Sequence, residues 1–297
     1  MDKPLAKKSL GQNFLIDKTV AQLMVKALDV QKEDAVIEIG SGTGVVTKPL
    51  AETCQQQKAR LTAVEFDVDL MPILKSNIPE NEYVKIVNAN ILNFLDDFKV
   101  AQNTNLKLVG SLPYNITSPL LHRLIKLEPM PETCVFLIQK EVGQKIFATA
   151  PDSNYLSVFV QTFYEPKILR IVDKSLFDPI PQVEGAVIKL EKKPAVMATS
   201  EISRYDKFLH HTFSHPRKML NKIFSKEELE KYKLDGTNRA QNYGWQEYLS
   251  TFLLNKSRVK VKKGPEPFFV DCEPFNGPLR KTDRNSFVTH PLAELLI

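Results

Sequence analysis

Cysteine is scarce in this chain, and long hydrophobic runs are missing. The three cysteines, Cys54, Cys134 and Cys272, lie far apart and lack the CxxC spacing of a zinc or redox site. This argues against a disulfide framework and favours reduced thiols. Nowhere do about 18 apolar residues follow one another, so we expect no segment that crosses a membrane. The basic N-terminus has no apolar segment behind its charges, which argues against a signal peptide. We therefore expect a cytoplasmic protein.

The chain also lacks a strong excess of charge of either sign. It has 40 Lys and Arg residues against 35 Asp and Glu residues, a net charge of +5. This mildly basic balance permits a polyanionic partner without establishing one. At 297 residues the chain is long enough for a large core and for two domains. A change in composition at residues 191–195 predicts a linker, so we place the domains at residues 1–193 and 194–297.

A glycine-rich turn follows the first strong strand pattern. Residues 35–39 are predicted to form a strand, residues 40–44 read Gly-Ser-Gly-Thr-Gly, and residues 45–54 are predicted to be helical. A strand, a glycine loop and a helix together seat a nucleotide-like ligand at the helix N-terminus. The spacing differs from the G-x-G-x-x-G of pyrophosphate binders, and there is no Walker lysine. A tighter loop suits a cofactor without phosphates, although such turns also occur for packing reasons.

Polar residues end the next two predicted strands, at residues 60–64 and 83–87. Glu65 lies 25 residues after Gly40, near the offset at which an acid accepts hydrogen bonds from ribose hydroxyls. The alternative for Glu65 is a solvated charge at a strand end. Asn90 follows the third strand, and its amide offers a donor and an acceptor to an adenine edge. Further strands are predicted at 106–109, 134–138, 163–171 and 185–190, and the whole pattern indicates an α/β fold.

Residues 110–114 read Gly-Ser-Leu-Pro-Tyr and directly follow a short apolar run. Ser111 offers a hydroxyl, and the carbonyl groups of Ser111 and Leu112 offer acceptors for an amine. Pro113 restricts Leu112 to extended conformations and has no N–H of its own. Tyr114 can stack on a base, or it can be a core residue of a strand-end turn. Phe177, in a proline-stiffened loop, is predicted to form a second aromatic wall or to close the end of the sheet.

The second half of the chain has a helical pattern and basic residues. Residues 225–228 form a capping box, residues 245–254 predict a helix, and Pro216 should interrupt the helical pattern before them. Five basic residues are expected to give this half of the chain a basic face: Arg204, Lys207, Arg217, Lys218 and Lys222. Residues 256–263 carry five positive charges, which either bind phosphate or form a solvated surface.

Three histidines in the second half, His210, His211 and His215, invite a metal interpretation. His211 and His215 would share a helical face, but no carboxylate or cysteine clusters near them in the sequence, and Pro216 disturbs the geometry. We therefore predict no metal site.

The chain resembles the ribosomal RNA adenine N6,N6-dimethyltransferases, and most closely the small-subunit enzymes of the KsgA/RsmA type. The resemblance rests on residues 11–15 (Gly-Gln-Asn-Phe-Leu), 38–44 (Glu-Ile-Gly-Ser-Gly-Thr-Gly) and 111–120 (Ser-Leu-Pro-Tyr-Asn-Ile-Thr-Ser-Pro-Leu), and covers roughly residues 5–250. It implies a Rossmann-like class I methyltransferase domain that uses S-adenosylmethionine, and a small helical C-terminal domain that docks on RNA. It also implies that the partner is ribosomal RNA in the immature small subunit, and we expect a monomer.

The resemblance assigns roles by position. The residues expected to bind the cofactor are Asn13, Leu15, Gly40, Gly42, Glu65, Phe66, Asn90, Ile91 and Ser111. Those expected to hold the target adenine are Ser111, Leu112, Pro113, Tyr114 and Phe177.

Two residues depart from the family pattern. Asn90 stands where the family has an aspartate that meets the adenine amino group, and its amide oxygen still accepts a hydrogen bond without the charge. Ser111 replaces the asparagine of the N-L-P-Y motif, although serine also opens the S-P-P-Y motif of some amino-methyltransferases of DNA bases. We expect activity to survive. The alternatives are a large-subunit methyltransferase of the macrolide-resistance type, an inactive RNA-binding assembly factor, and a small-molecule methyltransferase.

Overall fold

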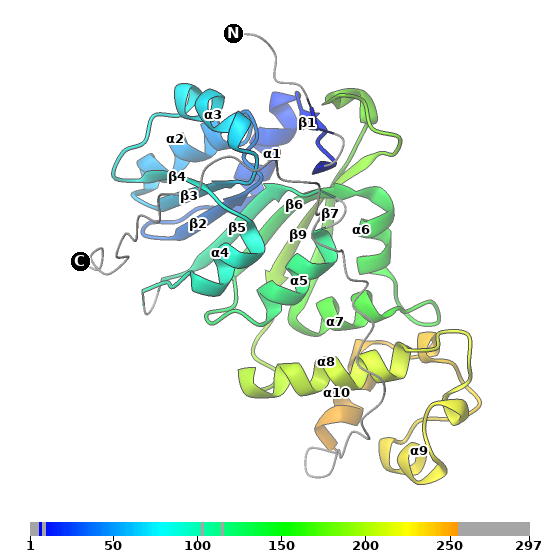
Figure 1. Cartoon of the computed structure of the whole chain (residues 1–297). Helices are drawn as coiled ribbons and strands as arrows, with labels where there is room; N and C mark the ends of the chain where they lie inside the picture. The colour runs from blue at the N-terminus through cyan, green and yellow to red at the C-terminus, as the bar shows by residue number, and fades with distance from the viewer. Residues whose placement is uncertain (1–5, 8–9, 102–103, 114–115, 255–297) are drawn as a thin grey trace, which may run out of the picture. The chain divides into compact units, whose positions relative to one another are not determined.

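The computed structural model describes residues 6–7, 10–101, 104–113 and 116–254 (Figure 1). Tyr114 and the basic run 256–263 lie outside the described residues. Within the described part of the chain, every helix is too short or too polar to span a lipid bilayer.

A sheet of seven strands forms the centre of the molecule, in the order β4-β3-β2-β5-β6-β9-β7. The first five of these strands run parallel, and β9 and β7 continue the sheet antiparallel. This mixed sheet with flanking helices confirms the predicted α/β, Rossmann-like fold. The strands are β2 (Ala35–Ile39), β3 (Arg60–Glu65), β4 (Val84–Asn88), β5 (Leu106–Ser111), β6 (Thr133–Gln139), β7 (Tyr164–Val172) and β9 (Gly185–Lys192).

Helices cover the sheet because its central strands are apolar on both faces. Figure 1 shows α4 and α5 in front of the sheet and α1 behind it. Asp17 caps the start of α1, where its carboxylate accepts from the Val20 N–H at 2.8 Å. The helices of this part are α1 (Lys18–Leu28), α2 (Thr47–Gln57), α3 (Met71–Asn77), α4 (Ile91–Asp97), α5 (Thr117–Ile125), α6 (Lys140–Phe147) and α7 (Tyr155–Phe163).

The direction in which successive strands are added to the sheet changes between β2 and β5, although the two strands run parallel. From β2 the chain moves outward through β3 to β4, and it then returns to β5 on the other side of β2. Ligands of open α/β sheets bind at the carboxyl end of the strands at such a point. The register aligns Ile39 with Val64 on one side and with Gly110 on the other, so the turns after β2, β3 and β5 meet at one edge.

A second, two-stranded sheet links two distant parts of the chain at the same edge. In it β1 (Phe14–Leu15) pairs antiparallel with β8 (Phe177–Asp178), and Leu15 stands opposite Phe177. The sequence analysis did not predict this pairing. It brings the N-terminal arm against the loop between β7 and β9.

The C-terminal helices pack on the sheet part through aromatic side chains. They are α8 (Thr199–Phe213), α9 (Lys226–Tyr232) and α10 (Trp245–Leu254). The predicted capping box is confirmed, because Ser225 and Glu228 exchange side-chain to backbone hydrogen bonds of 2.8 and 3.2 Å. α8 ends before Pro216, as that residue requires.

The predicted linker begins too early, because β9 continues to Lys192 and so includes Glu191. Met1–Lys256 form one compact unit that contains both the sheet and these helices. The division into two domains at residue 193 stays a prediction.

Candidate active site

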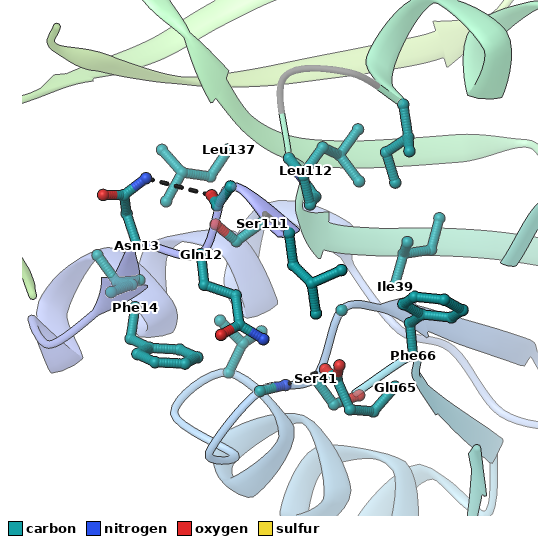
Figure 2. A pocket seen from close by; sticks show the side chains of 18 of the residues that line it. Gln12, Asn13, Phe14, Ile39, Ser41, Glu65, Phe66, Ser111, Leu112 and Leu137 are labelled. Atoms are coloured by element: carbon teal, nitrogen blue, oxygen red, sulfur yellow. Dashed lines mark hydrogen bonds between the residues drawn. The ribbon is translucent and has the colours of Figure 1, made fainter. Parts of the chain in front are cut away.

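One cavity of about 270 Å³ opens at the carboxyl edge of the sheet (Figure 2). It is lined by every described residue to which the sequence analysis gave a role in binding the cofactor or the adenine. They are Asn13, Leu15, Gly40, Gly42, Glu65, Phe66, Asn90, Ile91, Ser111, Leu112, Pro113 and Phe177. Tyr114 lies outside the described residues. The structure thus brings the predicted residues together, and the role of each one stays a prediction.

The glycine loop after β2 borders the turn after β5. Gly40 has a φ of +69°, which a residue with a side chain rarely adopts, and its N–H donates to the Val64 carbonyl at 2.9 Å. A Cβ atom placed on Gly40 would lie 3.3 Å from the carbonyl oxygen of Ser111. The absence of a side chain at Gly40 therefore lets the two loops that carry the predicted chemistry meet at one wall.

Glu65 is a fixed acceptor at this edge and not a solvated strand-end charge. Glu65 is buried, with only 6 % of its surface exposed. One carboxylate oxygen accepts from the Gly42 N–H at 2.7 Å, and the other accepts from the Asp67 N–H at 2.7 Å. Burial raises the pKa of Glu65, and these backbone hydrogen bonds oppose that effect. Each oxygen keeps a second lone pair for a hydroxyl donor.

Asn90 caps a helix, which the sequence analysis did not foresee. Its Oδ1 accepts from the Leu92 N–H at 2.9 Å at the start of α4. The oxygen on which the expected acceptor role depends therefore already accepts one hydrogen bond. Within the described residues the Nδ2 group of Asn90 has no acceptor, so this side chain offers a donor as well as the second lone pair of Oδ1.

The turn after β5 is held from three sides. A Cβ atom on Gly110 would lie 2.3 Å from the Ile39 carbonyl oxygen, so β2 and β5 approach each other too closely for any side chain there. The Leu112 N–H donates to the Leu137 carbonyl at 2.9 Å. The Pro113 carbonyl accepts from the Thr117 hydroxyl at 3.2 Å in the first turn of α5. These contacts give the Ser111–Pro113 segment a fixed position beside the cavity.

Two aromatic residues that line the cavity, Phe66 and Phe177, differ in their exposure. Phe66 is 57 % exposed directly after Glu65, so it presents a flat face. Phe177 is 7 % exposed and belongs to the hydrophobic core cluster that includes Leu137. Its position agrees with the alternative in which Phe177 closes the end of the sheet, although it also lines the cavity.

The N-terminal arm is tied to the residues just after Glu65, which sequence reasoning missed. Lys7 Nζ lies 2.5 Å from Asp67 Oδ1 and 2.6 Å from Asp69 Oδ2. Gln12 Nε2 donates to the other Asp67 oxygen at 2.8 Å. Lys7 therefore positions the arm in this structure. The sequence signal was weak, because nothing in the spacing relates Asp67 to a residue 60 positions earlier.

Within the arm, the side chain of Phe14 lies against the glycine loop. The ring of Phe14 lies 3.5 Å from the position of a Cβ atom on Gly42. Asn13 Nδ2 donates to the Gly11 carbonyl at 3.2 Å, the dashed line in Figure 2. The arm thus covers the part of the cavity that the glycine loop lines.

Glu38 is a second buried carboxylate that the sequence analysis did not single out. It is 1 % exposed, lines the cavity and accepts from the Ser41 hydroxyl at 3.1 Å. Burial raises the pKa of Glu38 to about 7, and the hydrogen bond from Ser41 opposes this rise. The sequence did carry a signal for Glu38, because it is the one charged residue in the otherwise apolar strand at residues 35–39.

The histidine pattern was partly misread. α8 ends at Phe213, so His211 and His215 do not share a helical face. The expectation that no carboxylate lies near these histidines is wrong for His210, whose Nε2 is 3.5 Å from Asp206 Oδ1.

Comparison with known proteins decides the family. The family model of the ribosomal RNA adenine dimethylases matches residues 4–256. The chain belongs to the ribosomal RNA adenine dimethylase family. It is therefore a methyltransferase, and the resemblance of its three motifs to this family is confirmed.

Curated relatives support the same assignment of this dimethylase. It is 34 % identical over 255 residues to the ribosomal RNA small subunit methyltransferase A of Sulfurihydrogenibium sp. (strain YO3AOP1), a match that covers 85 % of this chain and 97 % of the relative. It is 39 % identical over 218 residues to the protein of the same name from Thermotoga maritima, with 72 % of each chain covered.

Solved structures share the fold of this dimethylase. A dimethyladenosine transferase from Plasmodium falciparum superposes with a TM-score of 0.64 at 21 % identity, over 82 % of this chain and 97 % of that one. The 23S rRNA methyltransferase ErmE superposes with a TM-score of 0.63 at 21 % identity, over 82 % of this chain and 99 % of that one.

Proposed function

We propose that this dimethylase transfers two methyl groups from S-adenosylmethionine to the N6 amine of adenosines in small-subunit ribosomal RNA, in the cytoplasm, during ribosome assembly. One observation carries the proposal. The glycine loop and the Ser111–Pro113 turn line the same cavity, and only 3.3 Å separates the Cβ position of Gly40 from the Ser111 carbonyl oxygen. A donor and an acceptor of a methyl group need such a shared wall.

The residues of the cavity fit an adenosine cofactor that carries an amino acid and no phosphate. Glu65 has two buried, oriented oxygens, which suits a ribose diol and disfavours a 2′-phosphate. Phe66 offers a flat exposed surface to an adenine ring. The described lining of the cavity includes no lysine or arginine, so it offers no basic side chain to a phosphate. Bound there, S-adenosylmethionine would supply an electrophilic methyl group on a sulfonium.

Asn90 would meet the cofactor's adenine with its Nδ2 donor, while its Oδ1 accepts from the Leu92 N–H and holds the side chain in place. A donor suits the ring nitrogen N1, whereas the aspartate of the family would accept from the adenine amino group. This exchange keeps one hydrogen bond and removes a charge, so we expect moderately weaker cofactor binding and not its loss.

The target half of the site holds an amine by neutral acceptors. The adenine must leave its base stack to reach this cavity. The Ser111 carbonyl and hydroxyl can accept its N–H groups, and Tyr114 is expected from its motif to stack on the ring. As nitrogen attacks, it gains positive charge, which these oxygens stabilise without being protonated themselves, and the excess proton then leaves to water. The monomethyl product keeps one N–H group, so the same acceptors can hold it for the second transfer.

The test is methyl transfer to immature small subunits. The subunits are incubated with the protein and isotope-labelled S-adenosylmethionine, and their nucleosides are analysed by mass spectrometry. We expect label in N6,N6-dimethyladenosine from the small-subunit RNA. Labelled large-subunit RNA instead, located by primer extension, would refute the proposed substrate.

The departures Ser111 and Asn90 favour one second candidate, an RNA-binding assembly factor without turnover. The same experiment separates the two functions when binding is also measured. A protein that binds immature subunits while no label is transferred would be such a factor. The variants Ser111→Asn and Asn90→Asp restore the family's residues. Under our proposal the wild type already transfers methyl groups, so these variants change only the rate.

A further inference from the structure

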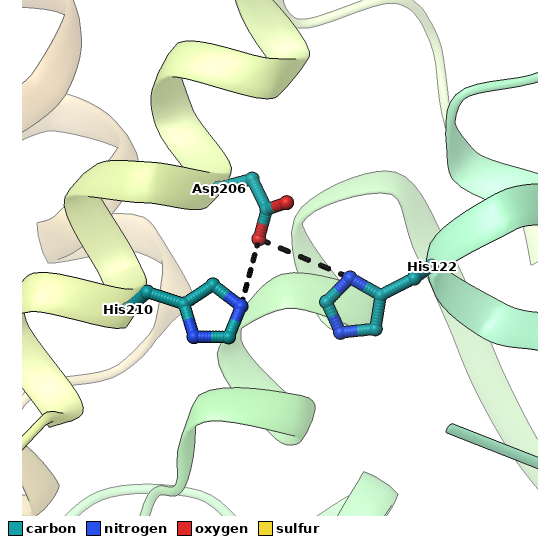
Figure 3. Close-up of side chains that lie close together, drawn as sticks. All are labelled: His122, Asp206 and His210. Carbon is teal, nitrogen blue, oxygen red and sulfur yellow. Dashed lines mark ion pairs between the residues drawn. The ribbon is translucent and has the colours of Figure 1, made fainter. Parts of the chain in front are cut away.

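A cluster of metal-ligating side chains lies between α5 and α8, outside the lining of the cavity (Figure 3). His122 comes from α5, and Asp206 and His210 stand one turn apart on α8. In the part of the chain that the structure describes, it is the one group of three or more His, Cys, Asp or Glu residues whose donor atoms converge, all within 4.8 Å of one another. The sequence hid it, because His122 is far from the other two along the chain.

The distances in the cluster fit a shared cation better than direct hydrogen bonds. His210 Nε2 lies 3.5 Å and His122 Nδ1 lies 3.9 Å from the same atom, Asp206 Oδ1. Both distances exceed the range of about 2.7–3.2 Å for an N–H···O hydrogen bond. In a tetrahedral zinc site, bonds of about 2.1 Å put neighbouring donor atoms about 3.4 Å apart. The Asp206–His210 pair already has this spacing, and a zinc ion would need His122 to move closer, since all three donor atoms lie within 4.8 Å of one another.

The two imidazoles also have lone pairs to offer. The hydroxyl of Tyr155 lies 3.1 Å from Nε2 and 3.3 Å from Nδ1 of His122. Because it is nearly equidistant from the two nitrogens, it lies along the in-plane lone pair of neither. Its ring is stacked parallel to that of His122, with 8° between the planes. Figure 3 shows both imidazoles directed at the carboxylate of Asp206.

Neighbouring groups orient the carboxylate for binding through one oxygen. Lys126 Nζ donates to Asp206 Oδ2 at 2.7 Å, and the Tyr155 hydroxyl donates to Oδ1. Such outer partners hold a ligand in the direction that the metal requires. Lys126 also reduces the negative charge of the site, which limits its affinity for a cation.

We propose that His122, Asp206 and His210 bind one zinc ion, with a water molecule as the fourth ligand. Two imidazole nitrogens and one carboxylate oxygen suit zinc and disfavour magnesium or calcium. The ion would join α8 to α5, the helix that begins directly after the Ser111–Pro113 turn. Its role is structural, because none of its three ligands lines the cavity.

The experiment is a zinc titration of the full-length protein after treatment with a chelator. Calorimetry should give one bound zinc per chain with micromolar affinity, and cobalt(II) at the same site should show the visible absorption of a tetrahedral complex. His210→Gln should lower the affinity at least tenfold, since it removes a ligand from a half-exposed position. His211→Gln is the matched control, because His211 is exposed, adjacent on α8 and outside the cluster; its affinity should not change.

A second ligand variant keeps the test decisive. Asp206→Asn retains the shape of the side chain and should also lower the affinity at least tenfold, and zinc should raise the melting temperature of the wild type but of neither ligand variant. The proposal is overturned if the wild type binds no zinc up to about 0.1 mM, or if both ligand variants bind it as tightly as the wild type. If the cluster only joins α5 and α8 by hydrogen bonds, the wild type will bind no zinc.

Discussion

Gly40→Ala tests whether the glycine loop and the turn after β5 act as one wall. An alanine at a φ of +69° costs about 1 kcal/mol of folding stability. Its Cβ would also lie 3.3 Å from the Ser111 carbonyl oxygen, a contact that only a shift of a few tenths of an ångström relieves. Reactions that depend on positioning lose about 100-fold for a misplacement of 1 Å, so we expect a loss of about tenfold in the rate of methyl transfer.

Gly11→Ala is the matched control for this variant. Gly11 has a φ of +64°, so alanine has a similar conformational cost there, but none of the described residues lies within 4 Å of its Cβ position. Stability is measured by urea denaturation, and methyl transfer is measured in single turnovers with saturating labelled cofactor. Both variants should lose about 1 kcal/mol of stability, whereas only Gly40→Ala should lose about tenfold in rate. Equal transfer rates in the two variants would refute the shared wall.

Three further predictions concern the pH response, the target half of the cavity and the sheet. Because burial raises the pKa of Glu38 from 4.5 to about 7, the folded state takes up a proton in this range, and stability falls as the pH rises through it, by about 3 kcal/mol in total. Glu38→Gln should remove most of this fall in urea denaturation between pH 4.5 and pH 8; an unchanged slope would contradict the burial of the charge. Tyr114→Ala should abolish methylation while calorimetry still detects cofactor binding, and full activity would rule out the stacking role. Gly110→Ala places a Cβ 2.3 Å from the Ile39 carbonyl and should cost about 3 kcal/mol, whereas Gly143→Ala in α6, with 3.7 Å to its nearest atom, should change stability by less than about 1 kcal/mol; similar values for the two would contradict the close approach of β2 and β5.

The sheet was predictable because its strands are short apolar runs between clear turn signals. Residues 35–39 form the predicted strand without change, and the strand at 60–64 gains only Glu65. In a parallel sheet both faces are buried, so such a run is mostly apolar, and Glu38 is the exception in residues 35–39. The turns that follow such strands meet at one edge, which is why the glycine loop, Glu65 and Ser111 could be grouped before their positions were known.

The contacts that were missed depend on residues far apart in sequence. The pairing of Leu15 with Phe177 joins strands of two residues each, too short for any periodicity. The bonds from Lys7 and Gln12 to Asp67, and the approach of His122 to Asp206, arise only when helices and loops pack. The capping role of Asn90 was missed for a local reason, because an asparagine before a helix can serve both as a cap and as a ligand, and its role toward the cofactor stays a prediction.

The central claim is that one cavity holds the methyl donor and the adenine side by side. The most direct measurement is the affinity of a conjugate in which the N6 of adenosine is joined by a short linker to the atom that replaces the sulfonium sulfur in a cofactor analogue. If both halves occupy adjoining parts of the cavity, the conjugate should bind at least about 100-fold more tightly than either half alone, and Gly40→Ala should reduce this gain. A conjugate that binds no more tightly than its cofactor half would contradict the claim.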